Sequence, residues 1–194
     1  MLIKTEFEVE QPVEKVWSYF EDIPAVAACL PGAELTDDLG DDRYQGRVAV
    51  RMGPVKLRFG GTAHITERDE PNKRIVVQAS GAEEKGKGQA EMLVTATLAR
   101  SGRGTKVAVI QDLQLSGAAA QYGRGMIADV TAVLMRDFSA NLQDRIARAE
   151  RGEVVGQQAG SSPAHGFTVA RKALMMALMR VFRRFFVPYQ PNPS

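Results

Sequence analysis

Hydrophobic and polar residues alternate along much of the chain between Leu2 and Leu115, and this spacing of two is typical of half-buried β-strands. Residues 2–9 place Ile3, Phe7 and Val9 on one face and charged side chains on the other. Turns that contain Gly or Pro separate further alternating segments at residues 44–52, 55–65, 75–80, 92–98 and 107–115. The pattern predicts antiparallel hairpins with one face toward solvent and one toward a core.

Helical patterns flank these strands. Pro12 opens a short helix, and Asp22 starts a second one that ends before Pro31. Between Ala118 and Ala149 the period becomes helical, with an apolar stripe at Tyr122, Met126, Val130, Val133, Leu134 and Phe138. This order predicts an α+β helix-grip architecture, in which a curved antiparallel sheet wraps around one long C-terminal helix, because that arrangement buries both apolar faces.

The chain changes character after residue 150. Residues 1–150 carry the predicted domain, whereas residues 151–165 are rich in Gly, Ser and Gln and predict a flexible linker. Residues 166–187 predict a separate amphipathic helix, which the Pro-rich residues 188–194 bring to an end.

Charge follows the same division. The net charge is +2, yet no acidic residue follows Glu153, whereas five of the 25 basic residues do. A mildly acidic domain with a basic tail predicts an anionic partner for the tail. The N-terminus has neither the basic nor the apolar region of a signal peptide, so we expect a cytoplasmic protein. Cys29 is the only cysteine, which excludes an internal disulfide and fits a reducing compartment.

The tail helix combines a large apolar arc with an opposite basic arc, as helices that lie in a membrane interface do. Each basic residue adds about 1 kcal/mol on an anionic leaflet, and each large apolar side chain about 1.5–3 kcal/mol on burial. We therefore predict peripheral binding to anionic lipids on the cytoplasmic face of the cell membrane. The predicted membrane-binding residues are Phe167, Leu174, Leu178, Val181, Phe182, Phe185, Phe186, Arg180, Arg183 and Arg184.

Other roles for the tail are less favoured. The three arginines interrupt its apolar run, so a membrane-spanning helix is not expected. Docking on another protein is the main alternative. Nucleic acid is not expected as a partner, because the basic face is short and the aromatic residues lie opposite to it.

Chemically active side chains are sparse. The two histidines, His64 and His165, stand far apart in the sequence, and no Cys, His or carboxylate cluster has metal-ligand spacing. We therefore expect no metal site, no catalytic residue and no enzymatic activity. Cys29 is expected to be a small buried residue rather than a nucleophile. Asp137 and Asn141 either bind a polar headgroup at a cavity mouth or mark where the long helix leaves the sheet.

A sheet wrapped around a helix can also enclose a pocket, which in proteins is typically apolar with few polar groups. The inward strand positions and the helix stripe predict such a ligand cavity, although the same residues are also compatible with a solid core. The predicted lining is Val48, Val50, Leu57, Phe59, Val77, Met92, Val94, Tyr122, Met126, Val130 and Leu134.

Several local sequences carry a family resemblance that covers about residues 1–150. They are residues 30–35 (LPGAEL), 44–50 (YQGRVAV) leading into Gly53-Pro54, 59–63 (FGGTA), and Gly117 followed by 120–123 (AQYG) and Met126-Ile127. These segments resemble the carbon monoxide dehydrogenase CoxG family, within the SRPBCC superfamily of Bet v 1/START-like helix-grip proteins. The resemblance implies association with aerobic molybdenum-type carbon monoxide dehydrogenases and a role in placing them at the membrane.

An apolar cavity tethered to a membrane suits a ligand that resides in that membrane. The main hypothesis is therefore a non-enzymatic protein that binds an isoprenoid quinone, menaquinone or ubiquinone, and links carbon monoxide dehydrogenase or a similar respiratory dehydrogenase to the respiratory chain. One alternative is a simple membrane anchor without a ligand. Another is a cyclase or aromatase of the same superfamily, which would need an acid or base in the pocket; Asp137 is the one hint of it.

Overall fold

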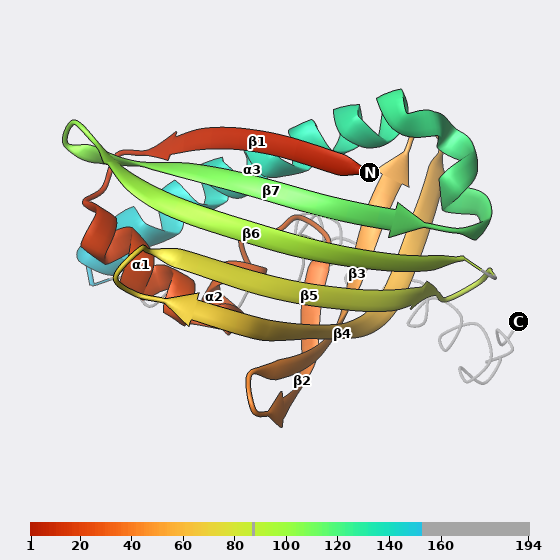
Figure 1. The fold of residues 1–194 in the computed structure, drawn as a ribbon, viewed down its shortest axis with the longest axis horizontal. Helices are drawn as coiled ribbons and strands as arrows, with labels where there is room; N and C mark the ends of the chain where they lie inside the picture. Colours follow the sequence, from red (N-terminus) through yellow and green to blue (C-terminus); the bar gives the residue numbers. More distant parts are fainter. Residues whose placement is uncertain (87, 153–194) are drawn as a thin grey trace, which may run out of the picture. The chain divides into compact units, whose positions relative to one another are not determined.

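A seven-stranded antiparallel sheet and one long helix dominate the computed structural model, which describes residues 1–86 and 88–152 (Figure 1). The strand order is β1-β7-β6-β5-β4-β3-β2, so the first strand joins the last one and the others pair as consecutive hairpins. The elements in chain order are β1 (Leu2–Val9), α1 (Val13–Glu21), α2 (Ile23–Ala27), β2 (Ala33–Gly40), β3 (Arg43–Met52), β4 (Val55–Asp69), β5 (Arg74–Glu83), β6 (Gln89–Ser101), β7 (Gly104–Leu115), the 3-10 helix η1 (Gly117–Tyr122) and α3 (Gly123–Glu150). The predicted helix-grip architecture is confirmed.

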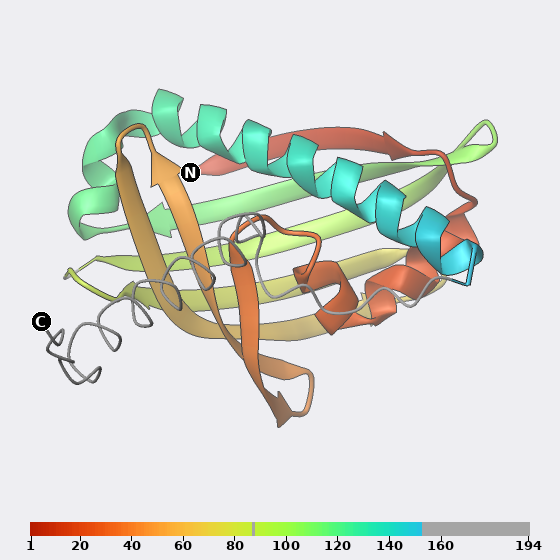
Figure 2. The same ribbon diagram turned by 180° about the vertical axis from the view of Figure 1, so that it is seen from behind.

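Helix α3 runs along the concave side of the sheet, and α1 and α2 cover one end of it (Figure 2). The side of α3 that faces the sheet repeats every three to four residues and includes Ile127, Thr131, Phe138, Leu142 and Ile146, which are all buried. Helix α2 begins at a local cap, because the Asp22 carboxylate accepts a hydrogen bond from the backbone N–H of Ala25 at 3.0 Å.

The sheet curves strongly where a row of small residues crosses it. Gly46 of β3 lies opposite Gly61 of β4, which lies opposite Gly81 of β5, and Ala90 of β6 continues the row. In both ribbon views β4 changes direction along its length (Figures 1 and 2). Missing side chains allow such bends and close backbone approaches, so this row opens space on the concave side of the sheet.

Buried side chains form two clusters. The larger one joins α1 and the C-terminal half of α3 to the sheet and includes Trp17, Phe20, Phe138 and Leu142. The smaller one joins the tip of the β3–β4 hairpin to η1 and the start of α3, and consists of Ile3, Met52, Leu57, Ala119 and Ile127.

Two details of the predicted elements are wrong. The sequence pattern did not indicate β2, because this edge strand is acidic and has few apolar residues. The long helix begins at Gly123 rather than Ala118, since residues 117–122 form η1 and Gly123 adopts a positive φ of 73° before α3 starts.

The predicted linker (residues 151–165) extends beyond the described residues after Gly152, and the predicted membrane helix (166–187) and Pro-rich end (188–194) lie wholly outside them. Across residues 1–86 and 88–152, no helix is long and apolar enough to cross a membrane.

Candidate functional site

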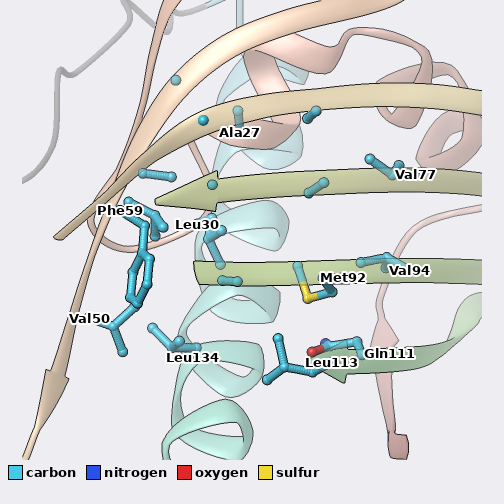
Figure 3. A pocket seen from close by; sticks show the side chains of 18 of the residues that line it. Ala27, Leu30, Val50, Phe59, Val77, Met92, Val94, Gln111, Leu113 and Leu134 are labelled. Atoms are coloured by element: carbon cyan, nitrogen blue, oxygen red, sulfur yellow. The ribbon is translucent and has the colours of Figure 1, made fainter. Parts of the chain in front are cut away.

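A cavity of about 470 Å³ lies between the concave side of the sheet and α3 (Figure 3). Its size falls within the range of about 300–1,000 Å³ that small-molecule sites occupy. Residues from both buried clusters line it, among them Phe20 and Phe138 from the larger and Met52, Leu57 and Ile127 from the smaller. The space between the two clusters is therefore a cavity and not a continuous core.

The cavity brings together nine of the eleven residues predicted to line it, and their side chains come from five strands and α3. Figure 3 shows Phe59, Leu30, Met92 and Leu134 arranged around the same open space. The nine residues are Val48, Val50, Leu57, Phe59, Val77, Met92, Val94, Val130 and Leu134.

Tyr122 and Met126 are corrections, because neither lines the cavity. Tyr122 belongs to η1, where it packs against the smaller cluster instead of continuing the α3 stripe. Met126 is 41% exposed, and its neighbour Ile127 takes the inward position. The stripe that ends at Phe138 thus passes through Ile127 rather than Met126 on its way back to the start of α3.

Several lining residues were not predicted. Helix α2 and the turn after it contribute Ile23, Val26, Ala27 and Leu30, and α3 contributes Thr131 and Met135. In β7 the sequence pattern itself held an unused signal: Gln111 occupies the inward phase of the alternation, between Val109 and Leu113. A polar residue in an apolar phase marks either a solvent-facing break in the pattern or a buried polar contact.

The inner surface of the cavity is apolar with few polar groups. Gln111 is 6% exposed, and its side-chain N–H lies 3.4 Å from the Met135 sulfur. Thr131 is 8% exposed and donates a hydrogen bond to the Ile127 carbonyl at 2.9 Å. Within the described part of the chain, the charged lining residues are Glu34 and Arg47, both exposed on β2 and β3. This arrangement suits a hydrophobic ligand with one or two polar groups.

The other candidate residues lie outside the cavity lining. The Asn141 amide donates a hydrogen bond to the backbone carbonyl of Cys29 at 2.9 Å, which ties α3 to the segment after α2. Asp137 is half exposed and lies 3.5 Å from Arg136. His64 is not a lining residue either. None of the three contributes a side chain to the lining of the pocket.

Cys29 is fully buried, as expected for a structural cysteine. Its thiol donates to the Ala25 carbonyl at 3.4 Å and lies 3.8 Å from the Tyr19 hydroxyl. Burial raises the pKa of the Cys29 thiol, which opposes formation of the nucleophilic thiolate. Residues 1–86 and 88–152 contain no group of three or more His, Cys, Asp or Glu side chains that could hold a metal ion.

Comparison with known families decides the relationship of this chain. The carbon monoxide dehydrogenase family CoxG matches residues 5–147. The chain belongs to this family. The matched residues include every strand of the sheet from Thr5 onward and all but the last turn of α3, so the CoxG region contains the whole cavity.

Solved structures show the same fold at low sequence identity. A conserved protein from Geobacillus kaustophilus has a TM-score of 0.68 at 21% identity, covering 77% of this chain and 97% of that one. The Zhui aromatase/cyclase from Streptomyces sp. R1128 has a TM-score of 0.56 at 14% identity, covering 83% and 99%. A START superfamily protein from Mycobacterium smegmatis has a TM-score of 0.53 at 14% identity, covering 76% and 97%. No match was found among curated proteins.

Proposed function

We propose that this CoxG-family protein binds an isoprenoid quinone, menaquinone or ubiquinone, in the cavity between the sheet and α3. In this account the protein carries the quinone between the membrane and carbon monoxide dehydrogenase or a similar respiratory dehydrogenase. The observation that carries the proposal is the apolar cavity of about 470 Å³ in a domain of the CoxG family.

The chemistry of the lining supports a lipid ligand. Inward side chains such as Val50, Met92 and Leu134 give an apolar surface that excludes water and favours a prenyl chain. Gln111 and Thr131 supply the few polar contacts that a ring head requires. A charged metabolite would instead need a paired countercharge inside the cavity.

Three further features connect this ligand to a membrane and a dehydrogenase. The acid-free, basic sequence after Glu153 supports attachment to anionic lipids, which are also the surroundings of quinones. The name of the family supports a carbon monoxide dehydrogenase as partner. A quinone ring accepts and releases electrons by its own chemistry, so the protein needs only to bind and position it, and we propose no intrinsic catalysis.

A quinone transfer assay between vesicles tests this proposal. Donor vesicles that contain menaquinone and anionic lipid are fixed to beads, acceptor vesicles lack quinone, and chromatography measures the quinone that reaches the acceptors. The full-length protein should accelerate transfer, and Val94→Trp, which fills the cavity, should not. Met126→Trp adds the same ring outside the cavity and should accelerate transfer like the parent.

The alternatives give different results in this assay. A membrane anchor without a ligand would bind both vesicle populations and leave the transfer rate at its spontaneous value in all three proteins. A fold of this kind also occurs in the Zhui aromatase/cyclase. A cyclase or aromatase would change the chemical structure of its ligand, which mass spectrometry of the recovered quinone would reveal.

A further inference from the structure

Strand β7 carries one polar side chain on its inward face. Val107, Val109, Leu113 and Leu115 follow the same phase as Gln111, and the first two are buried in the core. Gln111 also interrupts a row of aligned inward residues that crosses five strands. The register places it between Ile3 of β1 and Val94 of β6, and the row continues as Val77 and Ile65. An apolar residue would fit this position by pattern, by register and by burial.

The hydrogen bonds of Gln111 are poorly satisfied within the protein. A primary amide offers two N–H donors and a carbonyl acceptor, and leaving such groups unpaired away from water is costly. Among the described residues, the one partner of the Gln111 side chain is the Met135 thioether at 3.4 Å, and thioether sulfur is a weak acceptor. In Figure 3 the end of this amide points into the cavity, beside Leu113 and toward Met92. The amide therefore has bonding capacity left for a molecule in the cavity.

Thr131 adds a second polar atom to the cavity from the α3 side. It precedes Met135 by about one helical turn on the same face, and both line the cavity. Its hydroxyl proton is occupied by the Ile127 carbonyl, so the oxygen remains only as an acceptor. The polar part of the lining thus consists of neutral groups, with donors on Gln111 and acceptors on both residues.

We propose that Gln111 binds the oxygen-bearing ring of the ligand. This inference rests on the proposed function and specifies how the site recognises its lipid. The amide N–H donates to a ring carbonyl of the oxidised quinone, and the amide oxygen accepts from a ring hydroxyl of the reduced quinol. A neutral group with both capacities binds both redox states without burying a charge. The ring accordingly lies inside the cavity against β7, and the prenyl chain occupies the apolar remainder.

Binding measurements on the full-length Gln111→Leu variant test this assignment. Leucine keeps the approximate volume and removes both hydrogen-bonding groups. We expect it to weaken binding of a short-chain menaquinone, and of its quinol under anaerobic conditions, by about three- to tenfold, the usual value of a neutral hydrogen bond. Binding of squalane, a branched hydrocarbon without oxygen, should not weaken. Quenching of Trp17, the single tryptophan, reports quinone binding, and gas chromatography after gel filtration reports bound squalane.

Gln114→Leu is the matched control, because Gln114 is exposed on the outward face of the same strand. It should leave all three affinities unchanged. If the parent protein binds the quinone and Gln111→Leu binds it equally well, the assignment of Gln111 is wrong while the quinone function stands. An equal loss of squalane binding would show that Gln111 only shapes the cavity, which also overturns the assignment. A parent protein that binds squalane but no quinone would instead refute the proposed function.

Infrared spectroscopy on the parent protein provides a test that needs no variant. A hydrogen bond to a carbonyl lowers its stretching frequency, so a menaquinone labelled with carbon-13 at the ring carbonyls should show at least one band shifted down from its position in alkane solvent. A pair of unshifted bands in the bound quinone would contradict the proposal even if Gln111→Leu failed to fold.

Discussion

The backbone of Gly61 in β4 approaches the carbonyl oxygen of Ser80 in β5 so closely that a Cβ atom on Gly61 would lie 2.0 Å from that oxygen. This contact belongs to the row of small residues where the sheet bends around the cavity. The neighbouring Gly60 differs, because a Cβ atom there would have no other atom within 4 Å. The sheet therefore requires glycine at one of these two positions and tolerates a methyl group at the other.

Gly61→Ala is expected to lower the free energy of unfolding by about 1–3 kcal/mol or more, because backbone atoms of β5 must move to admit the methyl group. Gly60→Ala should change it by less than about 0.5 kcal/mol. Urea unfolding followed by circular dichroism measures both. Equal effects of the two substitutions would show that the bend does not depend on the close approach at Gly61.

A tryptophan placed in the cavity separates an open site from a solid core. Val50→Trp and Val94→Trp add a large ring at lining positions, whereas Met126→Trp adds it on the exposed side of α3. If the cavity is open, all three delipidated variants should keep melting temperatures close to that of the parent, and only the first two should lose quinone binding. Overpacking of a solid core typically costs about 1–3 kcal/mol. Marked destabilisation by Val50→Trp and Val94→Trp alone would therefore contradict an open cavity.

The sequence predicted the sheet and most of the cavity because β-alternation has a period of two, and one clear turn after each strand fixes which face is inward. It failed on α3 for a reason of geometry. Apolar residues occupy nearly every side of the first turns, so a stripe through Met126 fitted as well as one through Ile127. Packing of Phe138, Leu142 and Ile146 against the sheet sets the phase of the whole helix, and it leaves Met126 outside.

Other features escaped the pattern because their positions follow from tertiary contacts. The acidic β2 pairs as an edge strand through backbone hydrogen bonds, which require no hydrophobic alternation. Gln111 was passed over because a single polar residue looks like a flaw in an apolar phase, and only the register with Val94 shows that it is enclosed. The contribution of α2 to the cavity depends on how the chain folds back after Asp22, which no local period encodes.

Alkaline pH should destabilise the fold through Cys29. Burial raises the pKa of its thiol above the ordinary value of 9.0, so the folded protein holds this proton more tightly than the unfolded chain does. The resulting stability is fully present below about pH 9 and is lost as the pH rises through the folded-state pKa. Burial also raises the pKa of the adjacent Tyr19, which acts in the same direction.

Unfolding by urea between pH 8 and pH 10.5 tests this expectation. The free energy of unfolding of the parent should fall more steeply with pH than that of Cys29→Ala, which lacks the titrating thiol. Tyr19→Phe should also reduce the slope, without removing it. Parallel curves for the parent and both variants would show that the buried thiol and phenol do not contribute to alkaline sensitivity.

The basic sequence at the C-terminus, which lies outside the described residues, is predicted to carry the membrane affinity. A chain that ends at residue 160 should remain folded and should no longer sediment with anionic vesicles. At physiological salt, replacing Phe182, Phe185 and Phe186 with Ser should weaken binding more than replacing Arg183 and Arg184 with Gln. Salt screens the charge contribution and leaves the burial of apolar surface intact. Unchanged sedimentation of the shortened chain would assign membrane binding to the domain.

The central claim is that the cavity holds a membrane quinone, and the most direct measurement is the identity of the lipid that the protein retains. Full-length protein, produced in a host that makes menaquinone and ubiquinone and purified without detergent, is extracted with organic solvent and analysed by mass spectrometry beside Val94→Trp and Met126→Trp. The account predicts an isoprenoid quinone, approaching one molecule per chain, in the parent and in Met126→Trp, and its loss from Val94→Trp. An extract without quinone, or equal amounts of quinone in all three proteins, would contradict it.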